Sequence, residues 1–587
     1  MGFQKLLPLF LGLSLFHISA SALVLEGQVK DQDGKPVAGV MIKVVSSSAG
    51  ADTTKVFTGK DGRYRLPDMG TNVHINSLKI DTFRLGYEQT SPTNNVLTEL
   101  ADQSNPEVVK VDFSMQAIQN VAHQVPSSAW LAGTPSGEDR NRMMLTCSQC
   151  HQMPNERVRN FATSLEGLTE SQREQSWRAI AAYMRIAFYG ALQAEHAPGL
   201  AELPIEEIMK PEHSFINQAD EDALAPFLAK NMPTNFDNFD IEDVGSFTTG
   251  RLGVNERTVI REYTWPVGTS FIRETAVVDG EVWSVDIQRN RLAKLNPKNG
   301  SYRWYDLPRM GATAPHTIVP DLDGNLWLTL LGGTGESAAM FNPKSEEWRI
   351  FGGFPKGMVA HDFSAGANYK MAFDKNNFNW MTVINDNSLV GFNPDTGAVE
   401  RYLLPIPAGE SASNPDHIAV YGGGMTSDGN AWFAQYNGYF GRFNTTTKEV
   451  DHLVEFPDRQ GPHRFQIGDD DMIYVGLLAS GEIMVYDGAN LKEVKRIPLP
   501  DRNAAPYSLA WDPIRKVIWA GVTNNNTLFK IDPITGEAEE YPIEIKDLHI
   551  RMIAIDENNG DLWVTSSPLP PEEAAMNRIF QLHPGDI

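Results

Sequence analysis

Hydrophobic and polar positions repeat along the C-terminal part of the chain, from about residue 257 onward. Short apolar runs alternate with Asp-Gly and Asn-Pro turns, and one run in each repeat has an aromatic residue at its centre. Runs this short, bounded by turn residues, are typical of β-strands. The spacing of about 42 to 53 residues predicts units of four strands, and therefore a seven-bladed β-propeller over residues 257–587. The central aromatic residues are Trp283, Trp327, Trp380, Trp432, Tyr474, Trp519 and Trp563.

The same pattern predicts how the ring of blades closes. The last repeat stops after Leu582-His583-Pro584 and lacks a fourth strand, whereas residues 259–266 resemble the fourth strands of other repeats, such as residues 302–308. We therefore expect the segment near residue 259 to complete the last blade, which leaves no open sheet edge. An open solenoid would need a cap at each end, and the sequence offers none.

A second region of alternating positions covers residues 23–117. Asp33-Gly34 and Asp61-Gly62 are hairpin turn signals between apolar strands, and they predict a small β-sandwich of about seven strands. These residues resemble the carboxypeptidase regulatory-like domain, a transthyretin-like sandwich. The resemblance implies an accessory role in spacing or docking, or in binding sugar, without catalytic residues.

The first 22 residues have the pattern of a secretory signal peptide. Lys5 precedes an apolar stretch from Leu6 to Ile18, and Ala20-Ser21-Ala22 offers a cleavage site. The alternative, a membrane anchor, would need an apolar run of ~20 residues. We expect export to the periplasm, without a membrane span. The net charge of −24 disfavours nucleic acid as a partner, because an acidic surface repels phosphate.

The two cysteines of the chain form the strongest motif. Cys147 and Cys150 are followed by His151, which is the attachment signature of c-type haem. The two thiols bond to the haem and the histidine ligates its iron. A zinc site would need further ligands at similar spacing, and no other cysteine exists. Amphipathic patterns at residues 177–184 and 220–228 complete a helical module, residues 126–234, that resembles a small class I cytochrome c domain.

The sixth ligand of the haem iron has two main candidates, with another residue or an open site as the alternative. A Trp-x-x-hydrophobic-x-x-x-Met pattern, similar to that of small cytochromes, ends on Met184. A long insertion, residues 194–217, departs from that family and makes Met209 a rival. A methionine ligand would suit an electron carrier.

Histidines gather near one mouth of the expected propeller, which follows an acidic linker at residues 235–256. Aligning the blades places Glu274, Tyr369, Tyr421, Tyr507 and Arg551 at the position of His316 and His463. Three further histidines fall in the loops just before these inner strands: His361, His417 and His549. Five histidines at one mouth predict a second metal, copper before iron or zinc, as in the histidine-ringed propellers that this arrangement resembles. Glu274, Tyr507 and Arg551 would then face the substrate.

The Asp-Gly-Asn-x-Trp repeats look like those of the streptogramin (virginiamycin) B lyase family, whose members are seven-bladed propellers with a metal-assisted axial site. His316 and His463 match the histidine position of that family, but no glutamate stands three residues after any central aromatic. The acid–base pair of the lyase reaction is therefore incomplete.

Three functions follow for a mainly β protein of this organisation. The first is a periplasmic oxidoreductase, in which a small substrate reacts at the axial site and electrons pass to the haem and then to a soluble carrier such as another cytochrome. The second is a C–O lyase with an appended cytochrome. The third is a non-enzymatic electron-transfer protein. Fold alone does not choose among them.

Overall fold

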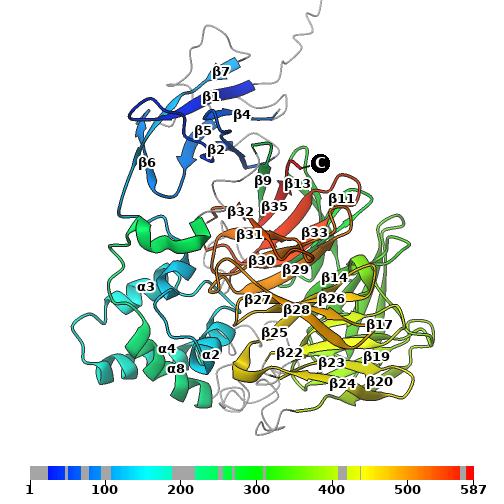
Figure 1. The fold of residues 1–587 in the computed structure, drawn as a ribbon. Coiled ribbons are helices and arrows are strands. Elements are labelled where there is room, and N and C mark those ends of the chain that lie inside the picture. The colour runs from blue at the N-terminus through cyan, green and yellow to red at the C-terminus, as the bar shows by residue number, and fades with distance from the viewer. Residues whose placement is uncertain are drawn as a thin grey trace, which may run out of the picture.

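The computed structural model describes residues 24–46, 51–67, 78–93, 108–187, 218–248, 256–266, 271–308, 313–406, 420–436, 438–545, 547–568 and 577–586. The predicted signal peptide, Met209 and His417 lie outside these residues. The chain is mainly β, with its helices gathered on one side of a large array of sheets (Figure 1). No helix in the described part of the chain is both long and apolar enough to cross a membrane.

Seven sheets form the C-terminal array within the described residues, as the aromatic repeats predict. Each central aromatic residue except Trp380 lies on the second strand of its sheet, and Trp380 lies on β18, the first strand of a three-stranded sheet. The inner strands from β21 through β25, β29, β33 and β10 to β14 contact one another in sequence. The first three sheets are β10 (Ile272–Val278), β11 (Glu281–Asp286), β12 (Arg291–Asn296) and β13 (Ser301–Asp306); β14 (Pro315–Pro320), β15 (Leu326–Leu330), β16 (Glu336–Asn342) and β17 (Glu347–Gly352); and β18 (Asn379–Val383), β19 (Ser388–Phe392) and β20 (Val399–Leu403). The next three are β21 (Val420–Met425), β22 (Ala431–Gln435), β23 (Tyr439–Asn444) and β24 (Glu449–Glu455); β25 (Pro462–Ile467), β26 (Met472–Leu477), β27 (Glu482–Asp487) and β28 (Lys492–Pro498); and β29 (Pro506–Asp512), β30 (Val517–Val522), β31 (Thr527–Ile531) and β32 (Ala538–Pro542). The last sheet contains β33 (Ile550–Ile555), β34 (Leu562–Ser566) and β35 (Arg578–His583), with β9 (Val259–Thr264).

The turns before the aromatic strands explain why an Asp stands six residues before the central Trp in two of the repeats. The indole N–H of Trp327 donates to Asp321 at 2.9 Å, and that of Trp380 donates to Asp374 at 3.0 Å. The carboxylate also accepts from backbone N–H groups of its own turn, so one side chain fixes both the turn and the buried indole. Because the turn and the indole need the same carboxylate, the Asp and the Trp occur together in these repeats.

Strand β9 closes the propeller and also joins it to the N-terminal sheets. It pairs with β35, as expected from the missing fourth strand, and on its other edge with β3 (Thr53–Phe57). The last blade therefore continues as β33-β34-β35-β9-β3-β2-β5. Lys55 of β3 is fully buried, forms an ion pair with Glu262 of β9 and donates to the Ile543 carbonyl at 2.5 Å. The N-terminal region is thus fused to the propeller through one sheet.

Two packed sheets make up the N-terminal region, and they share one apolar core. One sheet contains β1 (Val24–Asp31), β4 (Arg63–Arg65), β6 (Tyr87–Ser91), β7 (Val108–Lys110) and β8 (Phe113–Ala117); the other contains β2 (Met41–Ser46), β3 and β5 (Leu78–Phe83). Two layers agree with the sandwich that the alternating pattern predicts.

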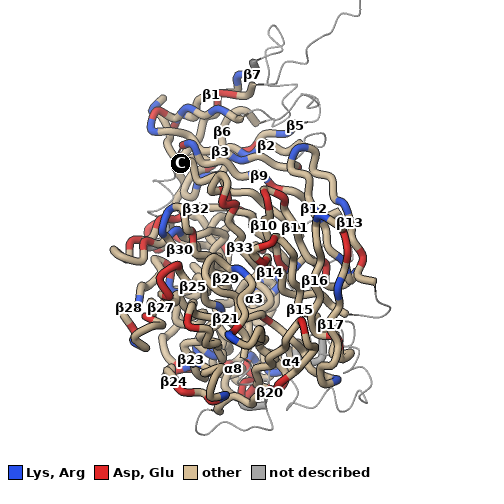
Figure 2. Tube along the Cα trace, turned by 90° about the vertical axis from the view of Figure 1, so that its right-hand side faces the viewer, with Lys and Arg blue, Asp and Glu red and all other residues tan. Residues whose placement is uncertain are grey.

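The helical region packs against one mouth of the propeller. It comprises η2 (Ser127–Leu131), α2 (Glu138–Cys147), α3 (Glu156–Thr163), α4 (Glu170–Ala187), α8 (Gln218–Asn231) and η5 (Ile241–Thr248). Its apolar core continues into the propeller, because Tyr421, Leu478 and Tyr507 belong to the same cluster as Met144 and Leu228. In the view of Figure 2 acidic positions are spread over the propeller and interleaved with Lys and Arg.

Candidate site on the propeller axis

The start of each inner strand contributes one side chain to a ring around the propeller axis. The strand register identifies the equivalent positions, because each follows a residue paired in the same way with the end of the second strand, as Pro315 is with Leu330. The positions are Arg273, His316, His361, Tyr421, His463, Tyr507 and Arg551, and all seven are buried. We call these residues the axial ring.

Two assignments of the sequence alignment are wrong in register. Arg273, and not Glu274, occupies the ring position of the first blade, because it follows Ile272, which pairs with Asp286 as Pro315 pairs with Leu330. In the third blade His361 takes the position expected for Tyr369: Ala360 bridges to Val383 as Pro315 pairs with Leu330. The pairing shifts at the same place in β14, β21, β25, β29 and β33, and alternation alone does not locate such a shift.

Arg273 connects three members of the axial ring by hydrogen bonds. Its Nε donates to His316 Nε2 at 2.8 Å, and its Nη2 donates to the hydroxyls of Tyr421 at 2.6 Å and Tyr507 at 2.8 Å. The two tyrosine hydroxyls are also hydrogen-bonded to each other, and Arg551 Nη1 donates to Tyr507 at 3.2 Å. The Tyr507 oxygen is therefore surrounded by hydrogen-bond donors.

These donors determine the acidity of the two tyrosines. Burial alone would raise the pKa of Tyr507, but the guanidiniums of Arg273, Arg551 and Arg464 outweigh burial and lower it. Burial raises the pKa of Tyr421. The pair is therefore unequal: Tyr421 keeps its proton and donates, while Tyr507 is the hydroxyl more readily deprotonated.

A buried ion-pair network lies next to the ring. Arg464 pairs with Glu274 and, at 3.2 Å, with Asp362, and none of the three side chains is more than 8% exposed. Burial raises the pKa of Glu274. Arg464 and His361 lower the pKa of Asp362 against the opposing effect of burial. Three buried guanidiniums thus face two buried carboxylates, so the axis favours one further negative charge.

The predicted haem-attachment loop reaches directly into this mouth. Arg551 Nη1 donates to the Gln149 carbonyl at 3.0 Å and Nη2 donates to the Cys150 carbonyl at 3.3 Å, while His549 Nε2 donates to the Ser148 carbonyl at 3.3 Å. The Arg551 side chain is therefore committed to the loop, to Tyr507 and to Ser567, rather than free to clamp an anionic substrate.

Gln149 inserts its side chain among the ring residues, a role that the sequence did not indicate. Tyr436 donates its hydroxyl to Gln149 Oε1 at 3.0 Å, and His463 Nε2 lies 3.3 Å from the same oxygen. The only sequence signal was the position of Gln149 between the two cysteines. The loop covers the mouth that the histidine pattern had identified as the substrate entrance.

The donor groups of the motif fit a covalent haem. Cys147 and Cys150 are free thiols, and burial raises their pKa values to about 12 and about 11, so both are protonated at neutral pH. His151 Nδ1 donates to the Gln152 carbonyl at 2.7 Å. That bond leaves the Nε2 lone pair for a metal, which is the second-shell arrangement of metal-ligating histidines.

The sixth ligand is not located by the described contacts. Met184 is half-buried on α4 and lies outside the apolar cluster that contains Cys147. That cluster instead holds four buried methionines, Met143, Met144, Met153 and Met232. Met184 and Met209 therefore both remain predictions.

Most ring histidines use their nitrogens in hydrogen bonds. His316 Nε2 accepts from Arg273, and His463 Nδ1 donates to the Tyr507 carbonyl at 3.1 Å. Burial lowers the pKa values of His316, His463 and His549 well below the usual range, so the imidazoles are neutral. Among the described residues, His316, His361 and Asp362 are the group whose donor atoms all lie within 4.8 Å of one another. A second metal would use these three residues, Asp362 being one that the histidine pattern missed.

Comparisons with known proteins concern the propeller. No protein-family model and no curated protein matches the chain. A streptogramin B lyase structure matches at 17% identity over 56% of this chain and 97% of its own, with a TM-score of 0.45. Selenomethionine-substituted virginiamycin B lyase from Staphylococcus aureus matches at 18% identity, over 55% and 99%, with a TM-score of 0.44. The β-propeller domain of Cps50 (Swd1) from Myceliophteria thermophila matches at 10% identity, over 55% and 99%, with a TM-score of 0.42. The solved structures to which this chain is similar include virginiamycin B lyases and β-propeller domains.

Proposed function

We propose that this protein is a periplasmic c-type haem oxidoreductase in which the axial ring and the haem-attachment loop form one redox site. The observation that carries the proposal is the set of hydrogen bonds from Arg551 and His549 to the carbonyls of Ser148, Gln149 and Cys150. These bonds hold an electron-accepting motif against a buried group of tyrosine, histidine and arginine.

The motif residues have defined roles in this proposal. Cys147 and Cys150 tether the haem and His151 ligates its iron, with Met184 or Met209 as the sixth ligand. When bound, the haem supplies one-electron oxidation and reduction. The Gln152 carbonyl fixes the orientation of the His151 ring, and the surrounding apolar cluster excludes water from the motif. The proton chemistry falls to the ring.

Tyr507 is the proton-accepting group of the proposed site. Its lowered pKa makes its phenolate accessible nearer neutral pH than that of an ordinary tyrosine. Arg273 and Arg551 stabilise the negative charge, and Tyr421 donates a hydrogen bond to it. Oxidation of a small hydroxyl-bearing or amine-bearing substrate releases protons as well as electrons, so a base beside an electron acceptor suits that reaction.

The remaining predictions belong to the same proposal. The helical region would be a class I cytochrome c domain, and the N-terminal sandwich a carboxypeptidase regulatory-like domain that braces the propeller through β3 and β9. Electrons would leave to a soluble cytochrome. The net charge of −24 favours a basic partner surface.

A second candidate function is a metal-assisted lyase of the streptogramin type. The group of His316, His361 and Asp362 favours it, because these donor atoms lie at ligand distances. In that case copper or another metal would be held there and the haem would be an appendage. The Arg273 guanidinium on His316 Nε2 disfavours a cation at this place.

Addition of small candidate substrates to the oxidised protein separates the functions. Our proposal predicts reduction of the haem, followed by its absorbance, with Tyr507→Phe slowing reduction at least ~10-fold, as loss of a general base does. Tyr402→Phe, in a half-exposed tyrosine that contacts Glu400, is the matched control and leaves the rate unchanged. Turnover with an unchanged haem spectrum would establish the lyase. Reduction by protein partners alone would establish an electron carrier.

A further inference from the structure

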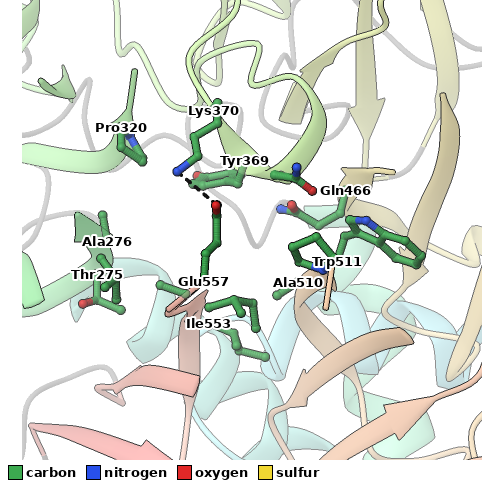
Figure 3. A pocket seen from close by; sticks show the side chains of 15 residues that line it. Thr275, Ala276, Pro320, Tyr369, Lys370, Gln466, Ala510, Trp511, Ile553 and Glu557 are labelled. Carbon is green, nitrogen blue, oxygen red and sulfur yellow. Dashed lines mark ion pairs between the residues drawn. The ribbon is translucent and has the colours of Figure 1, made fainter. Parts of the chain in front are cut away.

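A cavity opens at the end of the propeller axis opposite the haem-attachment loop. The inner strands lead from the axial ring to this cavity: β25 carries His463 near its start and Gln466 near its end, and β29 carries Tyr507 and Trp511 in the same way. Its lining includes Thr275, Pro320, Tyr369, Lys370, Gln466 and Trp511 (Figure 3). Because the loop covers the near mouth, this far mouth is the axial opening that the described residues leave for a small molecule.

Gln466 offers a polar group to the cavity. The side chain is only 7% exposed, it lines the cavity, and its amide makes no hydrogen bond among the described residues. A largely enclosed amide without a protein partner is available to hydrogen-bond a ligand or water. The amide can both donate to and accept from a hydroxyl group.

The backbone beside Gln466 is held in a strained conformation. Asn368 and Tyr369 follow each other in the left-handed region, with φ values of 57° and 54°. Consecutive non-glycine residues in that region are costly, and such strain concentrates at functional sites. Both Asn368 and Tyr369 belong to the lining of the cavity.

The charges and apolar walls restrict what the cavity can hold. Lys370 and Glu557 form an ion pair across it at 3.2 Å, so the charged groups of the lining neutralise each other. Trp511, Pro320 and Pro513 provide flat or rigid apolar walls. A charged ligand would have to break the ion pair, whereas an uncharged ligand would not.

We propose that the far mouth is a binding site for a small uncharged aromatic alcohol or phenol, with its hydroxyl on Gln466 and its ring against Trp511. The inference stands on the cavity and does not need the redox function. Within the proposed function, it names the class of molecule that would approach the axis from the side away from the loop.

Binding of 4-fluorobenzyl alcohol, followed by ¹⁹F NMR on the intact protein, tests the site. We expect saturable binding, weaker binding of 4-fluorotoluene and no binding of 4-fluorobenzoate. Gln466→Leu should weaken binding of the alcohol about 2- to 12-fold, which corresponds to one lost hydrogen bond, and leave 4-fluorotoluene unchanged. Gln32→Leu, on the exposed surface of the N-terminal region, is the matched control.

A second variant keeps the test decisive if Gln466→Leu does not fold. Ala554 is a half-buried lining residue, and Ala554→Phe should fill the cavity and abolish binding of both neutral probes. Tighter binding of 4-fluorobenzoate, or alcohol binding that neither variant changes, would overturn the inference. Binding of the alcohol without haem reduction would support the binding site and count against the oxidoreductase. Haem reduction by other substrates, without binding of the probe, would support the oxidoreductase and count against the binding site.

Discussion

At the residue scale, Tyr507 determines how the proposed site responds to pH. The pKa of its hydroxyl is lowered because Arg273, Arg551 and Arg464 together outweigh burial. A lowered pKa means that the phenolate forms as pH rises through a value below the ordinary ~10. We expect the rate of haem reduction by substrate to rise with pH through that range, and the rise to disappear in Tyr507→Phe. A profile that is identical in the variant would contradict the role of Tyr507.

The same group has a consequence for stability. Because the folded-state pKa is depressed, the deprotonated form contributes stability at pH above the unfolded value, and this contribution is lost as pH falls through the folded value. Chemical denaturation at several pH values should therefore show that the free energy of unfolding gains less from alkaline pH in Tyr507→Phe than in Tyr402→Phe.

Arg464 is the residue of the axis at which we expect a substitution to cost the most stability. Arg464→Met leaves Glu274 and Asp362 as buried carboxylates without their counter-ion, and should cost about 3–5 kcal/mol in the free energy of unfolding. The control is Arg303→Met, which breaks a pair with Glu346 whose side chains are 63% and 40% exposed, and should cost at most about 1 kcal/mol. If denaturant titrations gave equal losses of unfolding free energy for the two variants, Arg464, Glu274 and Asp362 would not stabilise the fold as one network.

At the element scale, the contact of α2 with the turn before β25 fixes the helical region on the propeller. Gly461 has a φ of 77°, and a Cβ there would lie 2.4 Å from Leu145 Cδ2. Gly357 has a φ of 79° and open space around its Cβ position. Both alanine substitutions carry backbone strain of about 1–2 kcal/mol, but only Gly461→Ala adds a steric clash.

We therefore expect Gly461→Ala to loosen α2 from the propeller and Gly357→Ala to leave that contact intact. Hydrogen exchange of residues 138–153 measures this, and faster exchange should appear in the first variant alone. Leu145→Ala should restore slow exchange to Gly461→Ala by making room. Equal exchange in both glycine variants would mean that the contact does not hold the loop.

The sequence predicted elements better than it predicted their register. The aromatic repeats located the second strands, and the missing fourth strand located β9, because both depend on local patterns. Arg273, and not Glu274, holds the ring position of the first blade, and pairing of β3 with β9 was not visible in either segment alone. Both depend on tertiary packing, which alternation does not encode.

At the scale of the whole molecule, one arrangement relates the parts to each other. The N-terminal sheets extend the last blade, the helical region covers one axial mouth, and a cavity remains at the other. The histidine pattern predicted convergence at one mouth but not that the Cys147–His151 loop occupies it, since contacts such as that of Gln149 with Tyr436 join residues far apart in the sequence. The central claim is that this loop and the axial ring form a single redox site.

Spectroelectrochemical titration of the purified protein tests that claim most directly. We predict a covalent haem whose midpoint potential falls in Arg551→Met and stays unchanged in Arg303→Met, because Arg551 is a buried positive charge bonded to the loop and removing it stabilises the oxidised, more positive haem. A protein without covalent haem, or one whose potential is the same in both variants, would contradict the account.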